Sequence, residues 1–198
     1  MAEYLNPEYW NNRYLDNRLG WDIGYPSTPL KTYIDQLTDS AIRIFIPGGG
    51  NAYEAQYLFE KGFANIFVVD VAQEAKNRFL ERCPNFPSAQ FLVTDFFGLT
   101  GTFDLILEQT FFCALNPKLR PAYAQKMNQL LAPKGKLVGV LFDFPLVSGP
   151  PFGGSKEEYR GYFEPYFHIE TLDRCYNSIP PRQGKELFFR LKPKVKGL

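Results

Sequence analysis

Short apolar segments alternate with segments of helical periodicity through the middle of the chain. Five apolar runs have the length and composition of strands that are buried on both faces of a sheet. They are Ile42–Pro47, Ile66–Asp70, Gln90–Val93, Phe103–Glu108 and Lys136–Phe142. Helical patterns fill three of the gaps, at Tyr53–Lys61, Gln73–Arg82 and Leu119–Leu131. This alternation predicts βαβ units and an α/β fold with a mostly parallel sheet.

The alternation breaks after Phe144, where a loop rich in proline and glycine begins. A short helix is predicted over Lys156–Phe163, followed by strands near His168–Cys175 and Lys185–Leu191. The segment Ser178–Gly184 reads as a hairpin-like connection between these two strands. We therefore expect about seven strands, with an antiparallel end to the sheet.

The first forty residues differ in character from the rest of the chain. Asn6–Arg18 has an asparagine cap, a proline and spaced aromatic residues, which predicts a short amphipathic helix. A turn-rich link follows, and Pro29 is expected in the first turn of a helix reaching about Leu37. Because this segment is too small to fold alone, we expect residues 1–40 to form an arm over a single domain spanning residues 1–198.

Composition narrows the possible classes of function. The 198 residues are 45% hydrophobic and 22% charged, which is typical of one globular domain. A net charge of +1 without basic runs argues against nucleic acid, and no apolar run approaches the ~20 residues of a membrane span. Cys83, Cys113 and Cys175 lie far apart in the sequence, and their spacing is not that of metal ligands. The sequence shows no signal-peptide pattern, which favours a reducing compartment. These features predict a cytoplasmic, monomeric protein that holds no metal and acts on a small molecule.

A glycine turn follows the first predicted strand and carries the first sign of chemistry. Gly48, Gly49 and Gly50 open a helix, and Asp70 ends the next strand at the spacing that suits ribose hydroxyls. A dinucleotide fingerprint would place glycine where Tyr53 stands, and its ring would crowd a pyrophosphate. S-adenosyl-L-methionine instead offers a carboxylate, a ribose and an adenine, with no phosphate. Alternatively, the glycines form only a tight turn and Asp70 caps a helix.

Two further acids end the next two strands. Asp95 could accept from an adenine amino group while the Phe96 ring lies on the adenine face, and Glu108 could accept from the amino group of a methionine. Each taken alone could equally be a cap or an exposed strand-end charge. Three carboxylates at successive strand ends, however, share the edge where open α/β sheets bind ligands.

Several longer motifs resemble one family over nearly the whole chain. VTDFFG, FDLILEQTFFCALNPKLRPAYAQKM, GPPF, PGGGNAYE and GWDIGYPSTPL resemble segments of the thiopurine S-methyltransferase family, which includes plant-type thiol and halide methyltransferases. The resemblance implies a Rossmann-like class I methyltransferase fold in three α/β/α layers. The implied sheet has seven mostly parallel strands with an antiparallel end strand. It also implies S-adenosyl-L-methionine as the cofactor.

The resemblance also implies roles for individual residues. For the cofactor these are Gly48 and Gly50 at the methionine portion, Asp70 at the ribose, Asp95 and Phe96 at the adenine, and Trp21 and Asp22 closing over it. Gln109 would border the substrate, where vertebrate relatives have arginine and plant relatives have tyrosine. Glutamine there argues against an anionic aromatic thiol. Phe152 lacks the hydroxyl that the plant relatives carry, which argues against a tyrosine-assisted reaction.

The chemistry of a sulfonium methyl asks for little from side chains, so we predict no dedicated catalytic residue. Proximity, alignment and a dry pocket suffice for a soft nucleophile. Aromatic residues could wall that pocket or belong to the core: Trp10, Tyr14, Trp21, Phe111 and Phe152. His168 and Cys113 are expected to be structural.

The predicted function is methyl transfer from S-adenosyl-L-methionine to a small thiol or similar soft nucleophile. Two alternatives remain open at this point. The acceptor could be an oxygen, nitrogen, halide or metalloid centre, or the chain could be a non-catalytic module that binds the cofactor.

Overall fold

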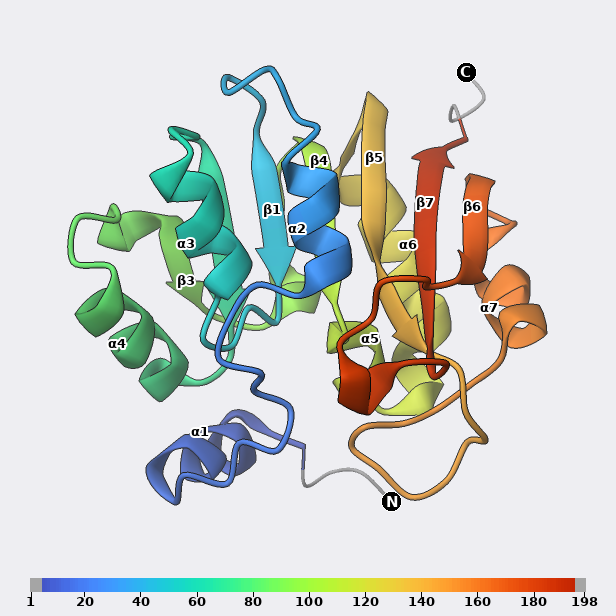
Figure 1. Cartoon of the computed structure of the whole chain (residues 1–198), viewed down its shortest axis with the longest axis horizontal. Helices are drawn as coiled ribbons and strands as arrows, with labels where there is room; N and C mark the ends of the chain where they lie inside the picture. Colours follow the sequence, from blue (N-terminus) through green and yellow to red (C-terminus); the bar gives the residue numbers. More distant parts are fainter. Residues whose placement is uncertain (1–4, 195–198) are drawn as a thin grey trace.

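A seven-stranded sheet runs through the protein, whose computed structural model describes residues 5–194 (Figure 1). The single domain predicted over 1–198 and its arm over 1–40 include terminal residues that lie outside the described part. The strand order is β3-β2-β1-β4-β5-β7-β6. The strands are β1 (Ile44–Pro47), β2 (Ile66–Asp70), β3 (Phe91–Val93), β4 (Phe103–Gln109), β5 (Leu131–Phe142), β6 (Phe167–Arg174) and β7 (Glu186–Pro193).

The first five strands are parallel, and β7 pairs antiparallel with both β5 and β6. The predicted Rossmann-like sheet with an antiparallel end is therefore confirmed. Because β1 has β2 on one side and β4 on the other, the chain changes direction across the sheet between β1 and β4. In open α/β sheets a ligand crevice forms beyond the carboxyl ends of the strands at such a point.

Helices cover both faces of the sheet. The helices are α1 (Pro7–Leu15), α2 (Thr28–Ile34), α3 (Tyr53–Glu60), α4 (Gln73–Arg82), α5 (Phe111–Ala114), α6 (Arg120–Leu130) and α7 (Lys156–Phe163). Short 3-10 turns are η1 (Ser88–Gln90), η2 (Phe96–Gly98), η3 (Pro117–Leu119) and η4 (Pro180–Arg182). Helices α2, α3 and α4 pack with one buried cluster, and α5, α6 and α7 with another, which gives the three layers.

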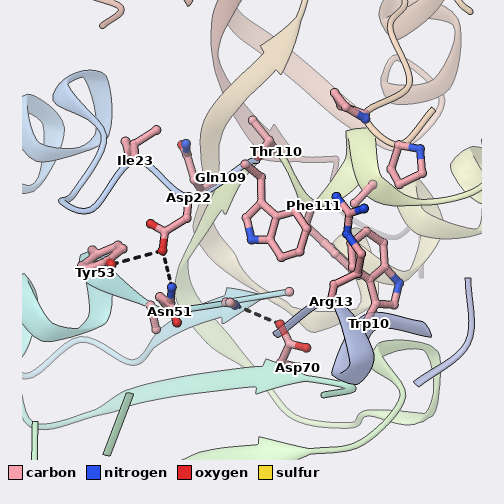
Figure 2. A pocket seen from close by; sticks show the side chains of 18 of the residues that line it. Trp10, Arg13, Asp22, Ile23, Asn51, Tyr53, Asp70, Gln109, Thr110 and Phe111 are labelled. Carbon is pink, nitrogen blue, oxygen red and sulfur yellow. Dashed lines mark hydrogen bonds between the residues drawn. The ribbon is translucent and has the colours of Figure 1, made fainter. Parts of the chain in front are cut away.

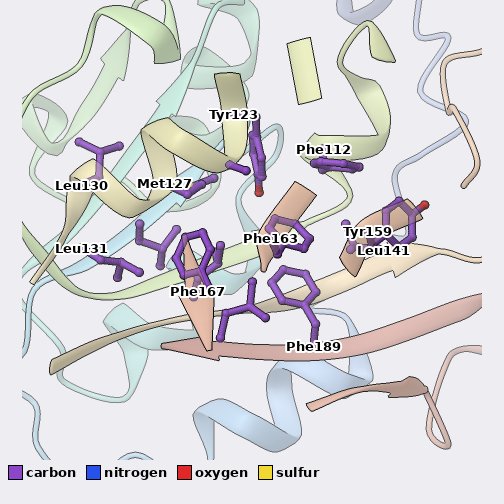
Figure 3. Close-up of a cluster of buried hydrophobic side chains, with 14 of the residues drawn as sticks. Phe112, Tyr123, Met127, Leu130, Leu131, Leu141, Tyr159, Phe163, Phe167 and Phe189 are labelled. Carbon is purple, nitrogen blue, oxygen red and sulfur yellow. The ribbon is translucent and has the colours of Figure 1, made fainter. Parts of the chain in front are cut away.

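The second cluster is rich in aromatic rings and forms the core under the antiparallel strands (Figure 3). Phe163 stacks on Phe189 with ring centroids 5.8 Å apart, and it meets Phe167 edge-on at 6.1 Å. All three rings are buried. Contacts of this kind fix β6 and β7 against α6 and α7.

Strand β5 begins earlier than predicted. The sequence predicts a helix to Leu131 and a strand from Lys136, with Pro133 and Gly135 between them, but β5 starts at Leu131. Leu131 pairs with Phe103 across a register shift before regular pairing resumes at Leu105 and Lys136. Long-range pairing with β4 therefore overrides the local turn signal. Helix α2 also ends at Ile34, short of the predicted Leu37.

The described part of the N-terminal arm contacts the body of the protein. Asn6 caps α1 by accepting from the Tyr9 amide at 2.8 Å, and Tyr14 is buried. Asn11 accepts from the Glu74 amide at 2.9 Å and so docks α1 against the start of α4. Among the described residues, no helix combines the length and apolar character needed to cross a membrane.

Candidate functional site

A cavity of about 390 Å³ lies beyond the carboxyl ends of β1, β2 and β4, with the N-terminal arm forming one wall (Figure 2). Its lining includes eight of the predicted residues: Trp10, Tyr14, Trp21, Asp22, Gly48, Gly50, Asp70 and Gln109. Phe96 and Phe111 line it as well. These ten predicted residues come from five separate stretches of the chain, and the fold brings them to one place.

The glycine loop after β1 is shaped by what surrounds it. Gly48 and Gly50 have φ values of +55° and +56°, which favour glycine. A Cβ on Gly48 would lie 2.1 Å from Cδ2 of Phe111, so no side chain fits there. The loop therefore approaches the cavity as bare backbone.

Asp70 fastens this loop to the end of β2. Its Oδ2 accepts from the Gly50 amide and its Oδ1 from the Ala72 amide, both at 2.9 Å. Burial raises the pKa of the Asp70 carboxyl, and the two amides oppose the rise. Each carboxylate oxygen keeps a further lone pair, and a pair of neighbouring hydroxyls could donate to them.

Asp22 connects the arm to the glycine loop. Its Oδ2 accepts from the Asn51 side-chain amide and from the Tyr53 hydroxyl, the latter at 3.3 Å (Figure 2). Its Oδ1 accepts from the Gly24 amide at 2.8 Å and fixes the turn that follows. Tyr53, which the sequence identified as a barrier to a pyrophosphate, thus lines the cavity and holds the arm.

Trp21 lies at the centre of an aromatic group in the arm. Its ring meets Trp10 and Tyr14 edge-on, with centroids 5.5 and 5.7 Å apart, and the Arg13 guanidinium lies 5.5 Å from its centroid. Burial raises the pKa of Tyr14 well above its usual range, so this phenol stays protonated at neutral pH.

Three predicted residues do not line the cavity. Asp95 is exposed and accepts from the Phe97 amide at 3.0 Å as the cap of η2. Glu108 is fully buried, where it accepts from the Tyr123 hydroxyl and from the Phe112 amide. Phe152, the last residue of the GPPF loop, is buried, while Pro150 and Pro151 of the same loop line the cavity. We therefore leave these three side chains out of the proposed cofactor and substrate site.

The reason for the Glu108 difference is local. The Thr110 backbone is left-handed (φ +58°), and α5 turns back immediately, which brings the Phe112 amide 3.2 Å from Glu108 Oε1. Burial raises the pKa of the Glu108 carboxyl to about 7. This acid therefore shapes the turn that presents Gln109 and Phe111, and its carboxylate does not line the cavity.

Sequence reasoning missed two cations that line the cavity, Arg13 and Arg182. Arg13 is in α1, and its Nε is buried without a partner. Arg182 is in η4, within the connection that the sequence identified only as hairpin-like. The Gln109 side-chain oxygen is likewise buried without a partner. A basic residue in a predicted loop gives no local sign that the loop folds against a site 161 residues away.

The described residues that line the cavity include no histidine and no cysteine. His168 lies on β6, where its backbone pairs with Lys192, and Cys113 is fully buried beneath β5. Burial raises the pKa of the Cys113 thiol to about 12. The cavity therefore offers shape, aromatic walls and fixed charge, and its carboxylates, Asp22, Glu54 and Asp70, accept hydrogen bonds from the protein.

Comparison with known proteins identifies relatives that are named as methyltransferases. Residues 5–196 match the family described as Thiopurine S-methyltransferase. A probable thiol methyltransferase 2 of Arabidopsis thaliana is 30% identical over 191 residues, covering 92% of this chain and 84% of the relative. A thiopurine S-methyltransferase of Acinetobacter baylyi is 24% identical over 192 residues, covering 85% and 88%.

Solved structures share the fold at lower identity. A Burkholderia thailandensis 1,6-didemethyltoxoflavin-N1-methyltransferase, solved with S-adenosylhomocysteine, superposes with a TM-score of 0.78 at 16% identity, covering 95% of this chain and 87% of that one. A magnesium protoporphyrin IX methyltransferase from Synechocystis, solved with bound SAM, gives 0.73 at 11% identity and covers 95% of each chain.

Proposed function

This chain belongs to the thiopurine S-methyltransferase family and is an S-adenosyl-L-methionine-dependent methyltransferase, and from this premise we propose that its acceptor is a small thiol or a similar soft, anionic nucleophile. The acceptor class is supported by the arginines that line the cavity, as argued below. It is also supported by relatives named as thiol and thiocyanate methyltransferases in Arabidopsis thaliana.

The residues of the cavity fit the cofactor. We assign the ribose hydroxyls to Asp70, whose two oxygens each keep a lone pair facing the cavity. We assign the methionine portion to the bare backbone at Gly48 and Gly50, and the adenine to the wall that Phe96 provides. Trp21, held by the arm, would cover the bound molecule.

When bound, the cofactor supplies a methyl group on a positively charged sulfur, which a soft nucleophile can attack directly. The protein's own residues orient the two partners and exclude water. The aromatic rings of Trp10, Trp21 and Phe111 give the cavity apolar walls that favour a sulfonium through cation–π attraction. No side chain needs to take a proton if the acceptor arrives already ionised.

One observation carries the acceptor class: two guanidinium groups, of Arg13 and Arg182, line the cavity. Gln109 lacks the positive charge that vertebrate relatives have at its position, but these arginines supply charge from other elements. The unpaired Nε of Arg13 is a donor placed for an anion. Because Asp22, Glu54 and Asp70 also line the cavity, a thiolate or a comparable anion would be attracted to the unpaired Arg13 donor and not to the cavity as a whole.

The direct test is a screen of methyl acceptors with S-adenosyl-L-methionine, following S-adenosylhomocysteine formation. We expect turnover with a small thiol or with an inorganic sulfur anion. Turnover confined to oxygen or nitrogen acceptors would contradict the proposed class. Absence of turnover with every acceptor, despite calorimetric binding of the cofactor, would favour a non-catalytic module.

A substitution tests the cofactor site. Asp70→Asn keeps the shape of the side chain but removes the charge and one acceptor, so we expect cofactor affinity to fall at least about tenfold, equivalent to about 1.4 kcal/mol. Asp39→Asn is the matched control, because Asp39 accepts from the Ala41 amide at 2.9 Å in the same i to i+2 turn but is exposed. Equal affinities of the two variants by calorimetry would contradict the assignment.

We also propose a cytoplasmic location and a single domain with residues 1–40 as its arm. The location is supported by the three cysteines, which are free and buried, as expected in a reducing compartment. The domain is supported by the arm's contacts, since Asp22 and Asn11 both hydrogen-bond to the body of the protein.

A further inference from the structure

The N-terminal arm contacts a second part of the protein that is distant in sequence. The Arg182 Nη2 donates to the main-chain carbonyl of Trp21 at 2.8 Å, across 161 residues of the chain. Figure 1 shows the β6–β7 connection, in red, beside the blue segment that follows α1. Both residues line the cavity. The contact therefore joins the arm to the far end of the sheet at the edge of the site.

Arg182 is itself held firmly by the body of the protein. Its Nη1 pairs with Glu186 Oε1 at 3.4 Å, four residues further along the chain at the start of β7. The side chains are only 11% and 3% exposed, and the Arg182 guanidinium lies 5.4 Å from the Phe142 ring centroid. A charge that is buried and paired in this way has little freedom to turn elsewhere.

The two neighbouring residues of the arm are thus held from opposite sides. Trp21 is bound through its carbonyl by Arg182 of η4, and Asp22 is bound through its carboxylate by Asn51 of the glycine loop. Within the arm, the Trp21 ring contacts Trp10, Arg13 and Tyr14. If the Arg182 contact is lost, the β6–β7 side no longer restrains the Trp21 backbone.

We propose that Arg182 is a positioning residue that latches the N-terminal arm across the cavity and so controls how fast a bound cofactor product leaves. The effect on cofactor exchange rests on the proposed cofactor site, whereas the effect on the arm does not. Arg182 acts through the Trp21 backbone, and this role is separate from the contribution of its charge to the cavity.

The protein carries its own reporter for this proposal. Its only two tryptophans, Trp10 and Trp21, both lie in the arm, with ring centroids 5.5 Å apart. Intrinsic tryptophan fluorescence therefore reports on the arm alone, without a label. Acrylamide quenching measures how often solvent reaches these rings in the ligand-free protein.

Three variants test the latch. Arg182→Met keeps the apolar stem and removes every donor. Arg182→Lys keeps a charge that can reach either the Trp21 carbonyl or Glu186. Arg160→Met is the matched control, since Arg160 also forms an i to i+4 ion pair, with Glu164 at 2.9 Å, on an exposed face of α7. We expect the quenching constant to rise in Arg182→Met, to rise less in Arg182→Lys, and to stay at the wild-type value in Arg160→Met.

Stopped-flow release of S-adenosylhomocysteine gives the second readout. We expect release from Arg182→Met to be about tenfold faster, as for loss of one charge-assisted hydrogen bond. Arg182→Met could unfold because it leaves Glu186 buried and unpaired. In that case the double variant Arg182→Met/Glu186→Gln, which also removes the Glu186 charge, is measured instead. Quenching and release that match Arg160→Met would overturn the latch. If S-adenosylhomocysteine does not bind the wild type, the proposed function fails, while quenching still decides the latch.

Discussion

At the scale of single residues, Gly48 has little tolerance for change. Its φ is +55°, and an added Cβ would stand 2.1 and 2.5 Å from Cδ2 and Cγ of Phe111. Phe111 is half-buried and meets Phe96 edge-on with centroids 5.3 Å apart, so its ring cannot move freely. The loop and this ring therefore define each other's position.

We expect Gly48→Ala to destabilise the protein and to weaken cofactor binding. Gly62→Ala is the control, since Gly62 also has a positive φ (+89°) but has open space around its Cα. Gly62→Ala should cost only the left-handed strain, about 1 kcal/mol, and Gly48→Ala about 1–3 kcal/mol more because of overpacking. Urea unfolding measures both. Equal losses would show that Phe111 yields to the added methyl group.

A site residue was predictable from the sequence where its position at the sheet edge was enough, and not where its role depended on the direction of its side chain. Gly48, Gly50 and Asp70 were recognisable because loop spacing alone brings them to the sheet edge. Glu108 ends a strand at the same edge, yet its carboxylate turns inward to Tyr123, a residue of α6. No local pattern records such a contact, and the same holds for Arg182 and Trp21.

At the scale of elements, the alternation of strands and helices was predictable because each parallel strand is apolar on both faces. The start of β5 was not, since Leu131 joins the strand only through pairing with Phe103 of β4. The four-residue helix α5 was also missed. It lies inside an apolar stretch. The hydrogen bond from the Phe112 amide to Glu108 and packing in the core stabilise it.

Two neighbouring residues of strand β7 test how much more the buried side chains on one face of the sheet contribute to stability than those on the other. Phe189 is fully buried against Phe163 on the α6–α7 face, while Phe188 on the opposite face is partly buried and lies 6.4 Å from Tyr33. We expect Phe189→Ala to cost about 3–5 kcal/mol. Phe188→Ala should cost about 1–2 kcal/mol, because less area leaves water on folding. Thermal or urea unfolding that ranks them the other way would contradict this assignment of the core.

At the scale of the whole molecule, the site is assembled from both ends of the chain. The arm supplies Trp21 and Asp22, the glycine loop supplies Asn51, and the β6–β7 connection supplies Arg182. A second pair of contacts joins the same two ends, because Thr28 and Thr32 of α2 hydrogen-bond to Asn177. Closure of the cavity is thus a property of the complete fold, and no single βαβ unit contains it.

Burial in the folded protein raises the pKa of three carboxyl groups: those of Glu54, Asp70 and Glu108. A raised pKa means that the folded state holds a proton that the unfolded chain has already released. The stability from such a group is complete below its unfolded pKa and is lost as the pH rises through the folded pKa. For Glu108 this window runs from the usual value of 4.5 to about 7.

We therefore expect the free energy of unfolding of the wild type to fall between pH 5 and pH 7.5 relative to that of Glu108→Gln. The difference should reach at most about 3 kcal/mol, given about 1.4 kcal/mol for each pKa unit. Urea unfolding at a series of pH values measures it. Glu170→Gln is the control, because salt bridges to Lys192 and Arg190 lower the pKa of the Glu170 carboxyl. Its titration acts below this window, so that variant should keep the wild-type slope. Parallel curves for the wild type and Glu108→Gln would mean that Glu108 stays ionised in the folded protein, held by the Tyr123 hydroxyl and the Phe112 amide.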